Sequence, residues 1–252
     1  MTKSTNLPSG WALWRQTITV YLAHWRLYSI IVLVITIPTA ALKVLASGDA
    51  TIVAYSSLAT LIMNVALIYA VIGFDEKPNV RPKLRGLFYE SSTVLIRYVI
   101  VGFTLAIMLI PAAFGLGLVG LASNTTTVPP LGEILLFGIV GLIIAIPSIY
   151  LLTRNGFGLI TVFENNNWPT NALRASRNLT KGYFWAVLGR NLIMALGLFI
   201  AIIPFSVVFI GLLIVTQNNL FASIYQIADT VILLPLLYIF MFKLSKALGV
   251  KE

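Results

Sequence analysis

Six long apolar stretches run through this chain, and nearly all of its positive charges fall between them on one side. A transmembrane helix needs about 20 apolar residues to cross roughly 30 Å of hydrocarbon. The stretches of this kind are residues 27–45, 52–74, 94–122, 131–152, 191–215 and 220–242. The sequence therefore predicts an all-α, polytopic membrane bundle of six transmembrane helices, with residues 1–252 forming a single integral membrane domain.

The composition supports lipid as the solvent of this chain. Of the 252 residues, 59% are hydrophobic and only 10% are charged, and the mean hydropathy is +0.95. A soluble domain usually has about 25% charged residues, so this chain has too few polar side chains to cover a surface in water. Cysteine is absent, which excludes a disulfide framework, a thiolate nucleophile and a thiolate metal site.

The placement of the basic residues predicts the orientation of the protein. With the amino terminus inside, sixteen of the seventeen Lys and Arg residues fall on the inner face and only Lys43 lies outside. Basic residues that flank spans are found mainly on the cytoplasmic side. We therefore expect a cell-membrane protein with both termini in the cytoplasm. Its net charge of +9 favours anionic membrane lipids as partners rather than nucleic acid.

An amphipathic helix is expected over residues 9–26, before the first span. Its aromatic and apolar stripe consists of Trp11, Trp14, Ile18, Tyr21 and Trp25. Trp and Tyr favour the headgroup level of a bilayer, so this helix is expected to lie in the interface plane. The alternative is a cytoplasmic helix that packs on the inner face of the bundle.

A unit of one amphipathic segment and two spans recurs three times in weak form. Each copy has an Ile-Pro step in its first span, at Pro38, Pro111 and Pro204. Pro147 and Pro235 lie in the second spans of the later copies. Proline is common in membrane helices, so chance is the alternative to a threefold internal repeat. We expect these prolines to bend or break their helices.

The segment WPTNALRASRNLTKGYFW, residues 168–185, is the most motif-like part of the chain. Thr170 or Asn171 is expected to cap a helix there, and Gly182 to end it. The cations that share one face at spacing i, i+3, i+7 are Arg174, Arg177 and Lys181. They are candidate contacts for an anionic lipid headgroup or a phosphate. Ordinary anchoring of a basic cytoplasmic loop is the alternative.

The run ALRASRNLTKGYFWAVLGRNLI, residues 172–193, resembles a stretch of bacterial six-span membrane proteins related to the glycerophosphodiester phosphodiesterase membrane domain. Other integral membrane families of similar layout share this pattern. The resemblance implies a membrane module from a bacterial or archaeal cell. It implies no hydrolase activity, because no soluble phosphodiesterase domain is recognised in this sequence.

One acidic residue, Asp229, lies deep in a predicted span. A carboxylate inside a bilayer is costly unless it is protonated or paired. Candidate partners are Gln226 and Thr230 on the same span and Asn64 on the second span. The functional interpretation is an intramembrane proton or cation site. The structural interpretation is a protonated acid hydrogen-bonded between helices, or a polar pocket that opens to the outer face.

No arrangement of residues that would indicate catalysis is recognised. The one histidine, His24, has no second His or Cys with which to share a metal ion. A phosphate-cradling GxxxxGK[ST] loop is missing, and helix packing explains the run GLGLVG at 115–120 better than nucleotide binding does. We therefore expect a protein that is not an enzyme and that holds neither a metal nor a cofactor.

Three functions are considered for this sequence, and a membrane enzyme is the least favoured of them. The first is a non-catalytic scaffold, assembly or lipid-interacting module that binds lipids and membrane protein partners. The scarcity of polar groups in the spans slightly favours it. The second is a small transporter or permease-like protein that uses Asp229. A water-accessible cavity that reaches Asp229 would reverse this order.

Overall fold

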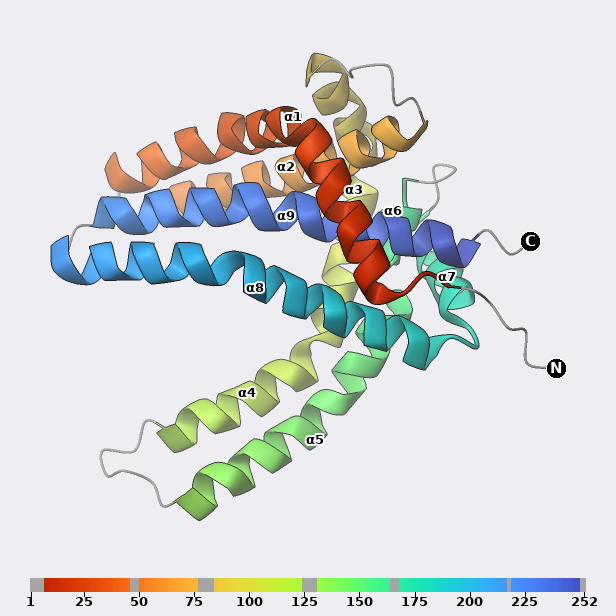
Figure 1. The fold of residues 1–252 in the computed structure, drawn as a ribbon, viewed down its shortest axis with the longest axis vertical. Helices are drawn as coiled ribbons and strands as arrows, with labels where there is room; N and C mark the ends of the chain where they lie inside the picture. The colour runs from red at the N-terminus through yellow and green to blue at the C-terminus, as the bar shows by residue number, and fades with distance from the viewer. Residues whose placement is uncertain are drawn as a thin grey trace. The chain divides into compact units, whose positions relative to one another are not determined.

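The computed structural model describes residues 7–45, 50–76, 84–123, 131–163, 168–216 and 219–249, and its regular elements there are all α-helices (Figure 1). In chain order they are α1 (Gly10–Leu45), α2 (Ala50–Glu76), α3 (Leu84–Met108), α4 (Ile110–Ser123), α5 (Leu131–Asn155), α6 (Gly158–Thr161), α7 (Pro169–Thr180), α8 (Phe184–Thr216) and α9 (Asn219–Gly249). By length and composition, six helical segments in these ranges can cross a membrane. The predicted all-α fold class is confirmed, and the chain is a multi-pass membrane protein.

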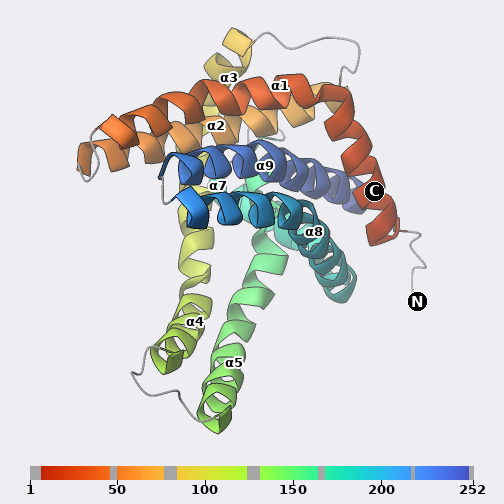
Figure 2. The same cartoon turned by 60° about the vertical axis from the view of Figure 1, so that its left-hand side comes forward.

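The chain divides into two compact units, residues 1–96 with 188–252, and residues 97–187. In the first unit α1, α2 and α9 pack on one another, and Figure 2 shows them running side by side. Tyr28, Leu67 and Phe240 contribute fully buried side chains to this three-helix bundle, one from each helix. The candidate functional site lies within it.

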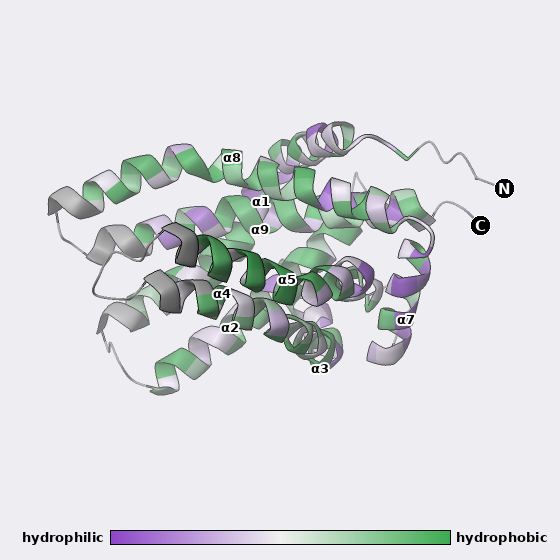
Figure 3. Cartoon of the chain, turned by 90° about the horizontal axis from the view of Figure 1, so that it is seen from below, coloured by the Kyte–Doolittle hydropathy of each residue, from purple (hydrophilic) through white to green (hydrophobic). Residues whose placement is uncertain are grey.

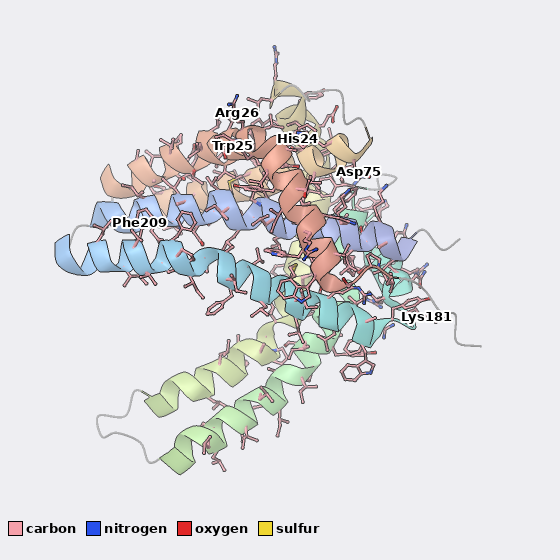
Figure 4. All side chains as sticks on the ribbon, in the orientation of Figure 1. His24, Trp25, Arg26, Asp75, Lys181 and Phe209 are labelled. Atoms are coloured by element: carbon pink, nitrogen blue, oxygen red, sulfur yellow. The ribbon has the colours of Figure 1, made fainter. Side chains whose placement is uncertain are left out.

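Helix α1 is continuous, so the predicted junction between an interfacial helix and a span at residues 26–27 is not a break. Nothing in this stretch stops the helix, and Pro38 is accommodated inside it. The helix bends instead, and Figure 4 places His24 and Arg26 near the bend. The part of α1 that covers the predicted interfacial helix, residues 10–26, is called the arm. The side chain of Lys43, predicted to be the one outer basic residue, lies outside the described part of the chain.

The aromatic stripe of the arm does not form a single exposed surface. Trp11 and Trp25 are each 49% exposed, whereas Trp14 is only 8% exposed. The Trp14 ring lies 6.3 Å from the Phe240 ring, measured between centroids, and it also packs against Gly197 of α8. Trp14 therefore anchors the arm to the bundle, while the rings of Trp11 and Trp25 remain about half exposed.

The third predicted span, residues 94–122, is not one helix. It divides at Leu109 because Pro111 has no amide hydrogen and its ring crowds the carbonyl group one turn earlier. The amide of Ala112 finds an acceptor on the neighbouring helix, where it donates to the Ser148 hydroxyl at 3.0 Å. The other four prolines of the predicted spans lie inside continuous helices.

In the second unit, α4 and α5 form a closely packed hairpin. Figure 3 shows that both helices are mainly hydrophobic along the parts it colours. Gly115 of the glycine-rich run lies directly against the backbone of Gly141, so that no side chain fits between the two helices there. This contact agrees with close helix packing as the role of the run.

The last two helices are longer than their predicted spans. Helix α8 begins at Phe184 and α9 continues to Gly249, so its last turns carry Lys243 and Lys246. A long proline-containing helical stretch followed by a second helix occurs three times, as α1–α2, α3/α4–α5 and α8–α9. The helix order therefore follows the layout of the predicted repeat.

Candidate functional site in the three-helix bundle

A cavity of about 250 Å³ lies between α1, α2 and α9, near the end of α1 and the beginnings of α2 and α9. We call it the Asp229 cavity. Its polar lining consists of Thr36 and Thr39 from α1, Ser56 and Thr60 from α2, and Gln226, Asp229 and Thr230 from α9. Thr60 and Gln226 are exposed, so the cavity is open at its rim.

Asp229 is the acidic residue of this cavity. Its Oδ1 atom is buried and has no hydrogen-bond partner among the described residues. No Lys, Arg or His side chain is found in the described lining. The carboxyl group therefore has no ion-pair partner in the cavity, although a charge within a bilayer is costly unless it is paired.

Two of the three partners predicted for Asp229 lie where they were expected. Gln226 lies less than one helical turn before Asp229 on α9, and Thr230 directly follows it. Both line the same cavity. Asn64 is not among the described lining residues, to which α2 contributes Ser56, Thr60 and Met63, so its role beside Asp229 stays a prediction. The Oδ1 atom of Asn64 is itself buried without a partner in the described part of the chain.

Sequence patterns did not single out the hydroxyl residues of α1 and α2. Thr36 and Thr39 are three residues apart, and Ser56 and Thr60 are four apart, so each pair shares one face of its helix. That spacing can be read from the sequence. Only the packing of the helices shows that both faces turn toward Asp229.

A second cavity, of about 290 Å³, lies at the other end of the same three helices. His24, Asp75 and Lys243 line it, one from each helix, and Figure 4 labels the first two. The Lys243 Nζ and Asp75 Oδ1 atoms are 3.0 Å apart, which ties α9 to α2. The His24 ring stacks on the Phe74 ring with 3.8 Å between centroids. His24 thus shares a cavity with an acidic residue far from it in sequence.

No protein-family model matches this chain, and neither does any curated protein or solved structure. The resemblance to the glycerophosphodiester phosphodiesterase membrane domain therefore rests on residues 172–193 and the span pattern alone. Among the described residues, no three His, Asp or Glu side chains gather closely enough to hold a metal ion. The geometry of the cavities is thus the basis for assigning a function.

The basic segment forms helix α7, but its start differs from the prediction. The helix begins at Pro169, and Trp168 precedes it without a side-chain cap, so neither Thr170 nor Asn171 is the cap. Proline suits the first helical position because its missing amide hydrogen is not needed there. Gly182 ends the segment as predicted, with a φ of 83° that favours glycine.

All three predicted cations of this segment are exposed, and Figure 3 shows α7 as a largely hydrophilic helix. The Nε atom of Arg177 donates to the Asn155 Oδ1 atom at 2.8 Å. Lys181 follows the last helical residue and has an extended backbone, so the shared helix face holds for Arg174 and Arg177 but not for Lys181. On the opposite face Ser176 donates to a carbonyl oxygen of α5 at 2.9 Å, which fastens α7 to that helix.

Proposed function

We propose that this membrane protein is a small transporter or permease-like protein in which Asp229 binds and releases a proton or cation. The observation that carries the proposal is the open cavity that reaches the buried, unpartnered oxygen of Asp229. A scaffold has no need for an unpaired acid in an open cavity within its spans. The cavity therefore supports a transporter more than a scaffold. We also propose that the protein is not an enzyme.

Prolines beside the cavity support this proposal, since they supply points at which the helices can flex. Pro38 lies between the two cavity threonines of α1, and Pro235 directly follows the part of α9 that lines the cavity. A proline removes one helix hydrogen bond and leaves a carbonyl oxygen one turn earlier without its usual donor. The Tyr21 hydroxyl of the arm donates to that oxygen, on Val231, at 3.4 Å.

In the proposed orientation, the two cavities lie on different sides of the membrane. With both termini in the cytoplasm of a cell-membrane protein, as the basic residues favour, the Asp229 cavity opens toward the outer face. The cavity with His24, Asp75 and Lys243 then lies at the inner face. The ion pair between Asp75 and Lys243 would hold the inner ends of α2 and α9 together while the outer cavity is open.

Reconstitution into liposomes tests the proposal. The native protein should pass protons or monovalent cations, and Asp229→Asn should lower that rate at least about tenfold, because the amide cannot take up a proton or balance a cation. The pH indicator pyranine reports protons, and radioactive sodium or rubidium reports metal ions. Glu90→Gln is the matched control, because it neutralises an exposed acid on α3 and should leave the rate unchanged. Equal rates for the native protein and Asp229→Asn would contradict the proposal.

A lipid-interacting scaffold is the second candidate, and the exposed cations of α7 favour it. Each basic residue near an anionic surface contributes about 1 kcal/mol. Replacing Arg174, Arg177 and Lys181 together by glutamine should therefore lower the retention of anionic lipid by about tenfold or more, as measured by native mass spectrometry.

A matched triple variant decides between a headgroup site on α7 and general anchoring. Arg15, Arg26 and Arg85 are also exposed, and their replacement by glutamine removes the same charge elsewhere. A headgroup site predicts that lipid retention falls only in the α7 variant. An equal fall in both variants, or none in either, would count against that site.

A further inference from the structure

We infer that the Asp229 cavity is a binding site for one monovalent cation, either a partly hydrated alkali metal ion or a small protonated amine. The inference rests on the proposed function, since both use the same cavity. It concerns what the cavity binds, and not whether the bound species crosses the membrane.

The hydroxyl groups around the cavity already donate their protons to backbone carbonyl oxygens of their own helices. A carbonyl oxygen only accepts hydrogen bonds, so a hydroxyl bonded to it must donate its one proton. The distances between hydroxyl and carbonyl oxygens are 2.8 Å for Thr36 to Val32, 3.0 Å for Thr39 to Ile35, 2.9 Å for Ser56 to Val53, 2.7 Å for Thr60 to Ser56 and 2.7 Å for Thr230 to Gln226. These side chains can therefore offer the cavity only oxygen lone pairs.

The charge of the lining determines the sign of the ligand. Asp229 brings one negative charge, and no basic side chain opposes it in the described lining. An anion would face both this charge and the lone pairs of the hydroxyl residues, and among the described lining side chains only the amide of Gln226 has N–H groups to offer it. Calcium sites generally combine several carboxylates, whereas this cavity has one. A ligand with a single positive charge matches the lining best.

The size of the cavity and the number of its oxygens indicate a ligand larger than a bare proton. A proton on Asp229 provides one hydrogen-bond donor, yet the side chains of five hydroxyl residues and Gln226 line the same space. One water molecule takes about 30 Å³ in the liquid, so a cavity of about 250 Å³ accommodates a cation with part of its hydration shell. The N–H groups of an ammonium ion or the waters of a metal ion would donate to the free lone pairs.

Thermal unfolding of the full chain in lipid nanodiscs tests this inference. The chlorides of sodium, potassium, ammonium and methylammonium replace N-methyl-D-glucamine chloride at constant chloride, and calcium chloride is a separate arm. At least one monovalent cation should raise the unfolding midpoint saturably, by roughly 5 °C at high occupancy. Comparison of the sodium and potassium salts with the ammonium and methylammonium salts shows whether the ligand is a metal ion or an amine. Calcium should stabilise the protein less than the best monovalent ion.

Variants of the lining test whether the shift comes from this cavity. Asp229→Asn keeps the shape of the side chain and should abolish the shift. Thr39→Val and Thr60→Val should each weaken the apparent affinity by roughly 3- to 10-fold, because each removes one acceptor oxygen. Thr104→Val is the matched control, because the Thr104 hydroxyl also donates to its own helix, at 2.8 Å, but lies outside the cavity. If Asp229→Asn does not fold, the threonine variants carry the test.

The outcomes separate this inference from the proposed function. No shift with any monovalent cation, an equal shift in Asp229→Asn, unchanged affinity in both threonine variants, or a larger shift with calcium would each overturn the inference. An Asp229-dependent proton flux without any cation shift overturns the inference and leaves the proposed function standing. A specific cation shift without any flux overturns the proposed function and leaves the binding site standing.

Discussion

Gly115→Ala on α4 should lower the free energy of unfolding by about 2 kcal/mol, even though alanine is the better helix former. The added Cβ atom would meet the carbonyl oxygen of Gly141 and lie 3.0 Å from its carbonyl carbon. Both are backbone atoms of α5, and they cannot rotate away as a flexible side chain can. The two helices would have to separate, which weakens the van der Waals contacts that hold membrane helices together.

The control for this prediction lies two residues further along the same helix. A Cβ atom at Gly117 meets nothing within 4 Å, so Gly117→Ala should be neutral or should stabilise the protein by up to about 1 kcal/mol. Unfolding by sodium dodecyl sulfate in mixed micelles measures both variants. If Gly115→Ala were as stable as Gly117→Ala, the close contact between α4 and α5 would be refuted.

Gly197→Ala on α8 should also lower the free energy of unfolding by about 2 kcal/mol, for a different reason. Its Cβ atom would lie 2.6 Å from the Cε2 atom of Trp14 and 2.8 Å from two further ring atoms. Trp14 is buried and packs against Phe240, so its ring has little room to withdraw. The substitution should therefore loosen the arm of α1 from the bundle.

Two comparisons isolate the contact between Gly197 and Trp14. Gly211→Ala makes the same change on the same helix where nothing lies within 4 Å, and it should not destabilise the protein. Adding Trp14→Phe to Gly197→Ala should cost less than the sum of the two single losses, because the smaller ring makes room for the methyl group. Strictly additive losses would mean that the two residues do not compete for the same space.

The six-span architecture was predictable because lipid imposes a length and a polarity that can be read from one sequence. Whether the helix continues or ends at each proline was not predictable. Pro38 and Pro111 both follow isoleucine within apolar stretches, yet α1 continues through the first while the chain divides before the second. At Pro111 the Ser148 hydroxyl of another helix accepts the Ala112 amide hydrogen, a tertiary contact that local sequence does not contain.

The same limit applies to the candidate site. Asp229 could be found as the one acid deep in a span, and Gln226 follows from its spacing on the same helix. The hydroxyls of Thr36 and Thr60 carry little signal, since such side chains in membrane helices commonly bond to their own backbone. Which helix faces meet depends on how α1, α2 and α9 pack, and in that packing Met63 of α2 lines the cavity whereas Asn64 is not among its described lining residues.

Because the chain has no cysteine, single introduced cysteines can report directly on whether water reaches the Asp229 cavity. Thr60 and Leu58 are both exposed on α2, but of the two only Thr60 lines the cavity. A thiol reacts as its thiolate, which forms in water and not in hydrocarbon. In native membranes Thr60→Cys should therefore react at least about tenfold faster than Leu58→Cys with a charged methanethiosulfonate reagent. Equal rates at the two positions would show that lipid, and not water, fills the space beside Asp229.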